Sequence, residues 1–278
     1  MKKYCITILV LIATTTAFAQ KKHSKHAKNP PPSSQDSTVV NKTPLAPIAV
    51  APAAPATGKP KKDWSKINLT KRSADHFMFQ LGYDNWAGAP DSIHIQGFNR
   101  SANFYFMFDF PFKTDPRLSI GTGLGIGSSN IFFHQQKVLV ASPGAATLGF
   151  PSEAGGDHWK KFKLVTTYLE VPVELRFAVD PEHMDNSWKF AIGVKVGLML
   201  SAYTKAKDRV NNAGQTIGNY IEKESSKQFF NTPRLAGTAR ISKGVIGIFG
   251  QFSGTTLIKS SAGPSVYPFS MGITLSGL

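Results

Sequence analysis

The chain has 278 residues, of which 41% are hydrophobic and 18% charged, and 32 Lys and Arg against 17 Asp and Glu give a net charge of +15. This length suits one large domain or two small ones, and the composition excludes a collagen-like or wholly disordered chain. Apart from a shorter stretch at the start, no apolar run reaches the ~18 residues of a membrane helix, which excludes a helical membrane protein.

The first 19 residues have the three parts of a secretory signal peptide. Two lysines precede an apolar core over residues 4–13, and a small-x-small pattern ends at Ala19, so cleavage is expected between Ala19 and Gln20. The single cysteine, Cys5, lies inside that core, so the mature chain has none. Disulfides, cysteine metal sites and a cysteine nucleophile are thereby excluded.

Residues 20–74 carry most of the positive charge, with 11 Lys and Arg against two Asp, and eight prolines. This composition cannot bury enough apolar surface to fold, and it predicts a disordered, basic, Pro-rich tether. His23 and His26 lie three apart, but a flexible tail explains them better than a metal site does. The tether lacks interleaved aromatic residues, so nucleic acid is not an expected partner, whereas anionic envelope polymers or lipid head groups are.

From Asp75 onward apolar residues recur at every second position, which is the period of a strand and not of a helix. The clearest runs are Phe104 to Phe112, Leu118 to Ile126, Leu169 to Phe177 and Trp188 to Leu200. Weaker runs lie at residues 77–83, 235–241, 246–252 and 269–275. The eight runs are long enough to supply the ~9–11 residues that cross a bilayer at a tilt.

The connections between these runs alternate in length. They cover residues 87–100, 113–116, 134–161, 180–186, 204–228, 242–244 and 259–265, and every second one is short. Outer-membrane barrels have short periplasmic turns and long outer loops. The pattern therefore predicts an all-β, eight-stranded antiparallel up-and-down transmembrane barrel over residues 75–278, with the tether in the periplasm.

The two faces of the strands indicate which side meets lipid. Glycines at 121, 123, 125 and 127 could not fill an apolar interior, but they would leave room for charged side chains in a lumen. The predicted lumen charges are Glu170, Glu174, Arg176, Lys189, Lys195 and Arg240. The predicted lipid-facing residues are Phe104, Phe106, Phe108, Phe110, Leu118, Ile120, Leu169, Val171, Val173, Phe190, Ile192 and Val194. A soluble lipocalin-like barrel, with its apolar side chains inside, remains an alternative.

Aromatic residues gather at both ends of the strands, as two interfacial girdles would. Those near the short turns are Phe110, Phe112, Phe177, Trp188 and Phe190. Those near the long loops are Tyr83, Trp86, Phe132, Phe133, Tyr203 and Tyr267.

Two strands also carry a family resemblance. Residues 168–177 read YLEVPVELRF and resemble the YLEIPL-type strand of the PorT-like outer-membrane β-barrel family of Bacteroidetes-type bacteria, and residues 119–125 resemble its GTGL-type strand. The similarity spans about residues 75–278. The resemblance implies an outer-membrane barrel without an assigned activity. One member type is associated with protein secretion across the outer membrane.

No residue pattern predicts a catalytic, metal or cofactor site. A rim enzyme would need a nucleophile and a base within hydrogen-bond reach, and the candidates in the loops form no motif. These candidates are His94, His134, Glu153, Asp157 and His158. The lumen charges have two interpretations, a narrow path for small solutes or a plug. The plug is favoured because the interior of eight strands is just wide enough for side chains.

The sequence therefore predicts a non-enzymatic outer-membrane component that anchors or contacts other envelope proteins. Outer-membrane lipid is one expected partner, and binding surfaces are expected on loops 134–161 and 204–228 and on the tether. An association with protein secretion is the specific version of this hypothesis. The alternatives are a small-solute pore, a rim-active enzyme and a soluble binding barrel, and the oligomeric state is left open.

Overall fold

The computed structural model describes residues 76–277. The predicted signal peptide with its cleavage point at Ala19 and Gln20, and the predicted tether over residues 20–74, lie outside the described residues. Within residues 76–277, no helix is long and apolar enough to cross a membrane.

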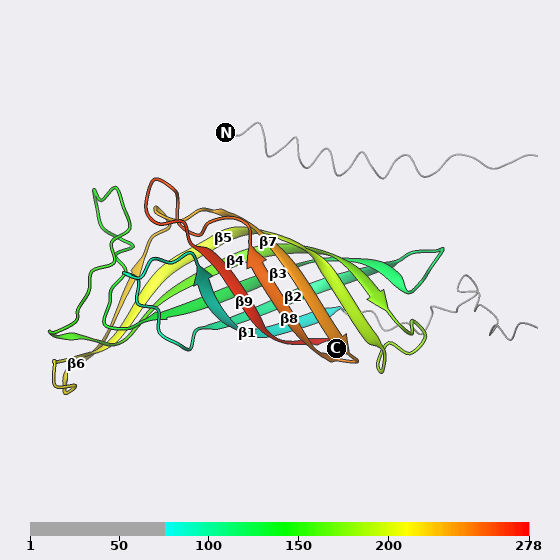
Figure 1. Cartoon of the computed structure of the whole chain (residues 1–278), viewed down its shortest axis with the longest axis horizontal. Coiled ribbons are helices and arrows are strands. Elements are labelled where there is room, and N and C mark those ends of the chain that lie inside the picture. Colours follow the sequence, from blue (N-terminus) through cyan, green and yellow to red (C-terminus); the bar gives the residue numbers. More distant parts are fainter. Residues whose placement is uncertain (1–75, 278) are drawn as a thin grey trace, which may run out of the picture. The chain divides into compact units, whose positions relative to one another are not determined.

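The described residues form one antiparallel sheet of nine strands (Figure 1). The strands are β1 (Phe77–Ala87), β2 (Arg100–Pro111), β3 (Leu118–Phe133), β4 (His158–Ala178), β5 (Trp188–Val210), β6 (Thr216–Ser225), β7 (Pro233–Lys243), β8 (Ile246–Ser253) and β9 (Tyr267–Ser276). Pairing runs in the order β4-β3-β2-β1-β9-β8-β7-β5, and an additional β4–β5 pairing closes the ring. The sheet is thus an all-β barrel whose first and last strands pair directly.

The connections separate into two kinds, which define a turn end and a loop end of the barrel. Residues 112–117, 179–187 and 244–245 connect strands at the turn end. The last of these is a two-residue turn in which Gly244 has φ +60, and a Cβ there would meet the backbone carbonyl of Asp185. Glycine is required because a side chain would be both strained and obstructed. The loop end carries the longer segments 88–99, 134–157 and 254–266.

The predicted loop 204–228 is wrong, because most of it is sheet. β5 continues to Val210, and β6 pairs with the part of β5 from Tyr203 onward. The turn between them has Gly214 at φ +79. Since most β6 side chains are exposed on both faces, no apolar face exists there whose alternation could have revealed a strand. Likewise residues 158–161, predicted as loop, belong to β4.

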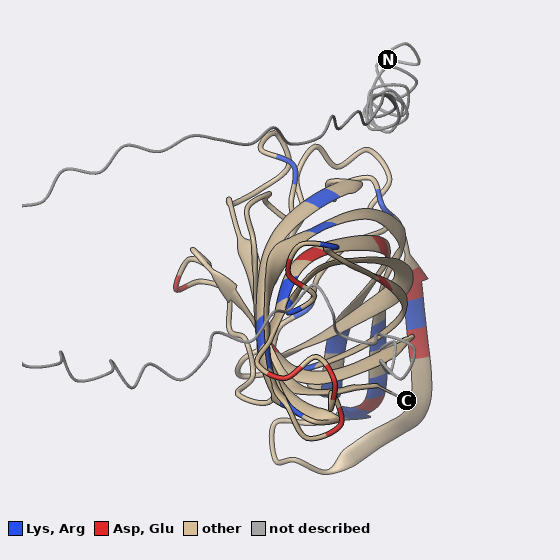
Figure 2. Ribbon diagram, turned by 90° about the vertical axis from the view of Figure 1, so that its right-hand side faces the viewer, with Lys and Arg blue, Asp and Glu red and all other residues tan. Residues whose placement is uncertain are grey.

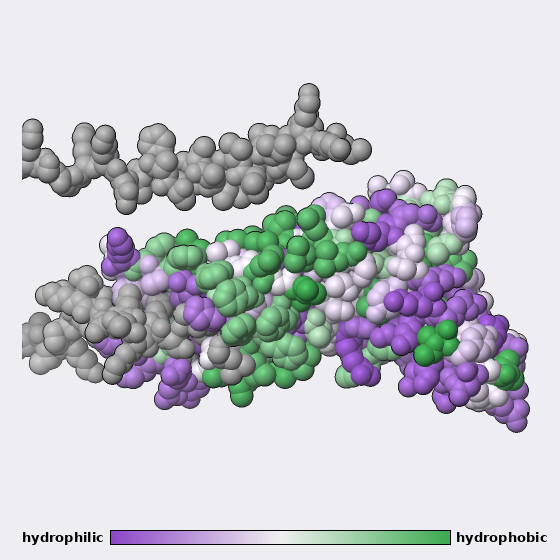
Figure 3. Space-filling model, turned by 180° about the vertical axis from the view of Figure 1, so that it is seen from behind, coloured by the Kyte–Doolittle hydropathy of each residue, from purple (hydrophilic) through white to green (hydrophobic). Residues whose placement is uncertain are grey.

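An apolar belt surrounds the middle of the barrel. Of the twelve residues predicted to face lipid, Leu118 and Leu169 are half-buried and the others are exposed. Figure 3 shows this belt as a hydrophobic zone that gives way to hydrophilic surface toward the loop end. Exposed Phe, Leu, Ile and Val on every ring strand would be unfavourable in water, so the belt is a surface suited to contact with lipid.

Toward the loop end the interior changes from charged to apolar. A register shift lies at Thr167/Tyr168 of β4, opposite Met199 and Ser201 of β5. Beyond it Ala202 and Ala206 of β5 point inward and are buried. A bulge of this kind changes which residues face inward, because one residue is left out of the pairing.

Three loops fold over this end and share one hydrophobic core with the strands. Val138 and Val140 come from loop 134–157, Phe230 precedes β7, and Ile258 lies in loop 254–266. Two residues predicted for the outer aromatic girdle, Trp86 and Phe133, are buried in the same core, and that prediction is wrong for them. Beyond the belt, apolar side chains of the strands and loops therefore fill the interior, as in a soluble barrel.

Candidate functional site

The lumen contains a network of buried charges, and the part nearer the turn end is built around Glu174. Arg240 Nη2 on β7 donates to Glu174 Oε2 at 2.9 Å, and Arg176 Nε donates to the same oxygen at 3.0 Å. Arg176 Nη1 also lies 3.6 Å from Asp109 Oδ1 on β2. Glu174 is only 1% exposed. A carboxylate this deeply buried is stable only with cationic partners, and here two guanidinium groups supply them.

The part of the network nearer the loop end is built around Glu170 and Lys195. The Tyr105 hydroxyl donates to Glu170 Oε2 at 2.5 Å, and Arg234 Nη1 donates to Glu170 Oε1 at 3.2 Å. Lys195 Nζ donates to Tyr105 Oη at 3.0 Å and lies 4.5 Å from the centre of the Tyr105 ring. It also donates to Gln80 Oε1 at 3.0 Å and to a further glutamine on β8. The ammonium group therefore has three oxygen acceptors despite being 1% exposed.

All eight ring strands contribute to this lumen network, which crosses the barrel from wall to wall. Its members are Gln80 (β1), Asn103, Tyr105 and Asp109 (β2), Ser119 (β3), Glu170, Glu174 and Arg176 (β4), Lys195 (β5), Arg234 and Arg240 (β7), Gln251 (β8) and Ser276 (β9). Figure 2 looks into the barrel and shows charged residues of both signs on the ring of strands. Side chains of opposite charge fill the interior, as expected for eight strands.

The glycines of β3 make space for two of these charges. A Cβ at Gly121 would meet the guanidinium of Arg176, and one at Gly127 would lie 3.1 Å from Glu170 Oε2. At Gly125 a Cβ would meet the ring of Tyr105. The bare face of β3 is therefore the surface against which the long side chains of the network pack.

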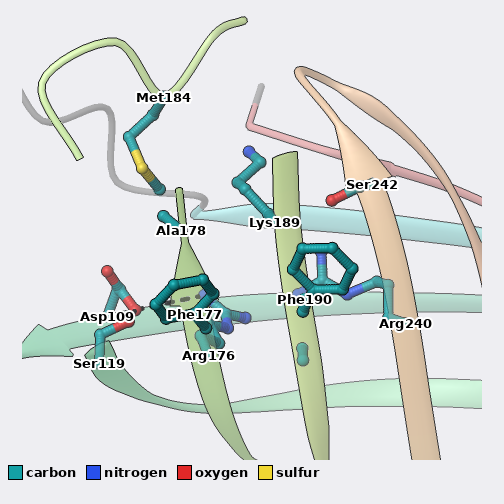
Figure 4. Close-up of a pocket in the computed structure, with 11 residues that line it drawn as sticks. Asp109, Ser119, Arg176, Phe177, Ala178, Met184, Lys189, Phe190, Arg240 and Ser242 are labelled. Carbon is teal, nitrogen blue, oxygen red and sulfur yellow. Dashed lines mark hydrogen bonds and ion pairs between the residues drawn. The ribbon is translucent and has the colours of Figure 1, made fainter. Parts of the chain in front are cut away.

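A small cavity remains at the turn end of the lumen. It has a volume of about 20 Å³, which is room for little more than one water molecule. Figure 4 shows Asp109 beside Arg176, with Arg240 reaching toward them from β7. Lys189 is buried and lines the same cavity, so the six charges predicted for the lumen all lie inside the barrel.

The sequence predictions did not include Arg234, Tyr105, Gln80, Asp109 and Gln251 among the lumen residues. The signal that could have found them is strand phase. Tyr105 and Asp109 alternate with the lipid-facing phenylalanines of β2, and Arg234 is in phase with Arg240 on β7. Residues that are uncharged, or that stand apart from other charges, form no recognisable charge cluster in the sequence, although they occupy the same face.

The rim candidates do not come together as a catalytic group. Glu153 lies 3.3 Å from Lys137 Nζ and 3.8 Å from Arg209 Nη1, and it accepts a bond from the backbone N–H of Trp159 at 3.2 Å. His158 Nδ1 contacts the backbone oxygen of Gly156 at 3.0 Å. His94 and His134 meet through their backbones, with His134 N donating to His94 O. Glu153 therefore ties loop 134–157 to β4 and β5.

Metal-binding geometry is likewise not found in the part of the chain that the structure describes, which holds no group of three or more His, Cys, Asp or Glu. An open groove of about 880 Å³ lies on the apolar belt. It is lined by outward-facing residues of β5, β7, β8 and β9 such as Val194, Ala239 and Phe252. Its wall is almost wholly apolar, so it offers a surface to hydrocarbon and not to a reacting polar substrate.

Comparisons with known proteins place the barrel among outer-membrane proteins. Residues 73–276 match the family model described as "Outer membrane protein beta-barrel domain". No curated protein matches the chain. Among solved structures, Ail, the attachment invasion locus protein of Yersinia pestis, crystallised with the heparin analogue sucrose octasulfate, is similar over 73% of this chain and 99% of that chain, at 11% identity and a TM-score of 0.32.

Proposed function

We propose, from the premise that the chain belongs to the outer membrane protein beta-barrel domain family and lies in the outer membrane, that it is a non-enzymatic and non-conducting component that contacts other envelope proteins. The observation that carries this proposal is the lumen network, in which buried ion pairs join β4 to β2 and to β7 across the barrel. In this function the barrel is an anchor, and its two ends supply the binding surfaces.

A conducting role is disfavoured by the geometry of the lumen. An ion would have to pass between Glu174 and the two arginines that contact it, where the adjoining cavity holds about one water molecule. Opening a path between these side chains would separate buried charges from their partners, which is unfavourable in free energy. Barrels with an open aqueous channel generally have more strands.

The loop end is suited to presenting a fixed surface. Loop 134–157 places Val138, Val140 and Leu148 in the shared core, and Leu148 N donates to Ala262 O of loop 254–266 at 2.7 Å. Gln228 Nε2 donates to Ser142 O at 3.3 Å. Loops that share a hydrophobic core lose less conformational entropy when they bind a partner than free loops do. In the proposed orientation this end faces outward, as long loops do in outer-membrane barrels.

The opposite end faces the periplasm in this proposal, with residues 20–74 extending there as a basic tether after removal of residues 1–19. An association with protein secretion is the most specific form of the hypothesis. It is supported by the resemblance of residues 168–177 and 119–125 to two strands of the PorT-like family.

Two experiments test the proposal. Purified barrel in planar bilayers is expected to give no discrete conductance steps at neutral pH. Regular steps would show that the lumen is a pore and not a plug.

Photo-crosslinkers at single sites in residues 20–74, and at Ser142 and Asn212 in the loops, are expected to trap defined envelope proteins in intact cells. Lipid-facing Ile192, which is 66% exposed on the belt, provides the control site. If the loop and tether sites trap nothing beyond this control, the interaction role is wrong.

The enzyme alternative has its own test. His134, Asp157 and His158 are replaced together by alanine, and any hydrolytic turnover detected with the purified protein is compared between this variant and the wild type. The proposal expects no turnover in either. Turnover that is lost in the variant would show that the rim is an active site.

A further inference from the structure

Beyond the apolar belt, the outer face of the sheet carries two rows of basic side chains. In the first row Lys163 of β4 pairs with Lys205 of β5, which pairs with Lys223 of β6. In the second row Lys161 pairs with Lys207. Phe132 of β3 pairs with Lys163 and continues the first row on the neighbouring strand. The Arg100 guanidinium lies 5.8 Å from the centre of the Phe132 ring. These six basic residues, Arg100, Lys161, Lys163, Lys205, Lys207 and Lys223, are called the basic rows.

This arrangement is unfavourable for the protein alone. Like charges directly opposite each other on neighbouring strands destabilise a sheet, and here three lysines stand side by side. Partial burial, and then the charges of Lys205 and Arg100, lower the pKa of Lys163. Lys163 Nζ donates to the neutral Asn130 Oδ1 at 2.7 Å, which does not offset its positive charge, so an external anion would stabilise the rows.

The acidic residues of the neighbouring strand do not neutralise the basic rows. Glu222 and Glu224 of β6 pair with Ala206 and Thr204, which are buried on the inner face, so they lie on the opposite side of the sheet from Lys223. Among the described residues, the only acidic group within 4 Å of a lysine of the rows is Asp208, at 3.9 Å from Lys207.

The rows lie where the head groups of the adjoining leaflet are expected. On β5 the last exposed aliphatic residue is Leu200, and Tyr203 and Lys205 follow it on the outer face. Lys205 is five residues beyond Leu200, which on a strand tilted by about 40° is about 12 Å along the membrane normal. Aromatic residues followed by basic ones are typical of a membrane interface. Lys223 Nζ lies 4.3 Å from the centre of the Tyr203 ring, and Lys163 Nζ lies 5.6 Å from that of Phe132.

We propose that the basic rows bind the phosphate groups of lipid head groups in the outer leaflet. Neighbouring strands are about 4.8 Å apart, so lysines on two of them can contact the same phosphate. The apolar belt directly below would contact the acyl chains of the same lipid. This continuity of basic rows and belt favours a membrane lipid over a soluble polyanion, for which the belt would have no role.

The test compares lipid binding by the full mature chain and by two matched variants. The probe is diphosphoryl lipid A in nanodiscs of phosphatidylcholine, with bound lipid counted by native mass spectrometry. The patch variant carries Lys163→Gln, Lys205→Gln and Lys223→Gln. Each lysine near an anionic surface strengthens binding about fivefold, so this variant is expected to bind on the order of a hundredfold more weakly.

The control variant loses the same charge elsewhere, through Lys113→Gln, Lys227→Gln and Lys259→Gln, and is expected to bind as the wild type does. All three of these lysines are exposed and lie outside the basic rows. Binding by the wild type is expected to weaken between about 50 and 500 mM salt, because screening acts on exposed charges. Dephosphorylated lipid A is expected to bind the wild type and the patch variant equally weakly.

A thermal measurement separates a binding defect from a folding defect. In zwitterionic detergent without lipid A, the patch variant is expected to melt at the same temperature as the wild type or higher, because like-charge repulsion is removed. Lipid A is expected to raise the melting temperature of the wild type only. Three results would each overturn the proposal. They are an equal loss of lipid A binding in both variants, binding of dephosphorylated lipid A to the wild type as strong as that of diphosphoryl lipid A, and complete displacement of lipid A by millimolar tripolyphosphate. The last would identify a soluble ligand.

Discussion

The substitution Glu174→Gln tests whether the lumen network holds the barrel together. Glu174 Oε2 accepts bonds from Arg240 and Arg176 at 2.9 and 3.0 Å, in a site that is almost free of solvent. Glutamine keeps the shape and one oxygen acceptor but removes the negative charge. Two guanidinium groups are then left in the lumen with a weaker partner.

The magnitude follows from these contacts. At an effective dielectric constant of about 20, each charge pair about 4 Å apart contributes about 4 kcal/mol of attraction. Much of this offsets the desolvation of the three groups in the wild type, and removal of one partner of a buried pair typically costs about 3–5 kcal/mol. We expect Glu174→Gln to lower the free energy of unfolding by about this amount.

The assay is urea unfolding in short-chain phosphatidylcholine vesicles, followed by tryptophan fluorescence. Glu222→Gln on exposed β6 is the control and is expected to change stability by less than about 1 kcal/mol. The double variant Glu174→Gln with Arg240→Met restores the charge balance and is expected to recover at least half of the loss, because Arg176 keeps Asp109 as a neighbour. A loss for Glu174→Gln no larger than that of the control would refute the reasoning.

Two further predictions use the same barrel. Gly193→Ala is expected to lower the free energy of unfolding by about 1–3 kcal/mol, since its Cβ would meet the backbone carbonyl of Val173. Gly237→Ala, with open space around its Cβ, is expected to be near neutral. Equal urea midpoints for the two variants would contradict this prediction. At the turn end, the Arg117 side chain holds the pKa of Asp115 below its ordinary value, so this pairing stabilises the turn above about pH 4 and is lost as the pH falls through the lowered pKa. Arg117→Gln is expected to raise the Asp115 pKa in an NMR titration, and an unchanged value would show that the pairing does not form.

Much of the fold could be predicted because strand phase is local. The alternation of phenylalanine with polar residues in β2 places Phe104 outside and Tyr105 inside whichever strands are its neighbours. Successive connections of an antiparallel ring lie at alternate ends, so the alternation of short and long gaps could be assigned to a turn end and a loop end. The prediction failed at β6, where both faces are exposed and no apolar alternation marks the strand, and at Trp86 and Phe133, which lie beyond the belt.

The sequence by itself determined which side chains of a strand share a face, because successive residues of a strand point to opposite faces, and it favoured the charged face as the lumen. Only the tertiary structure decided how the inward residues pair. Glu174 contacts Arg240, 66 positions away, and Lys195 contacts Gln80, 115 positions away. These contacts depend on strand register and on the closure of the ring, which no local pattern encodes. The basic rows depend on the same register, which aligns Lys163, Lys205 and Lys223 across three strands.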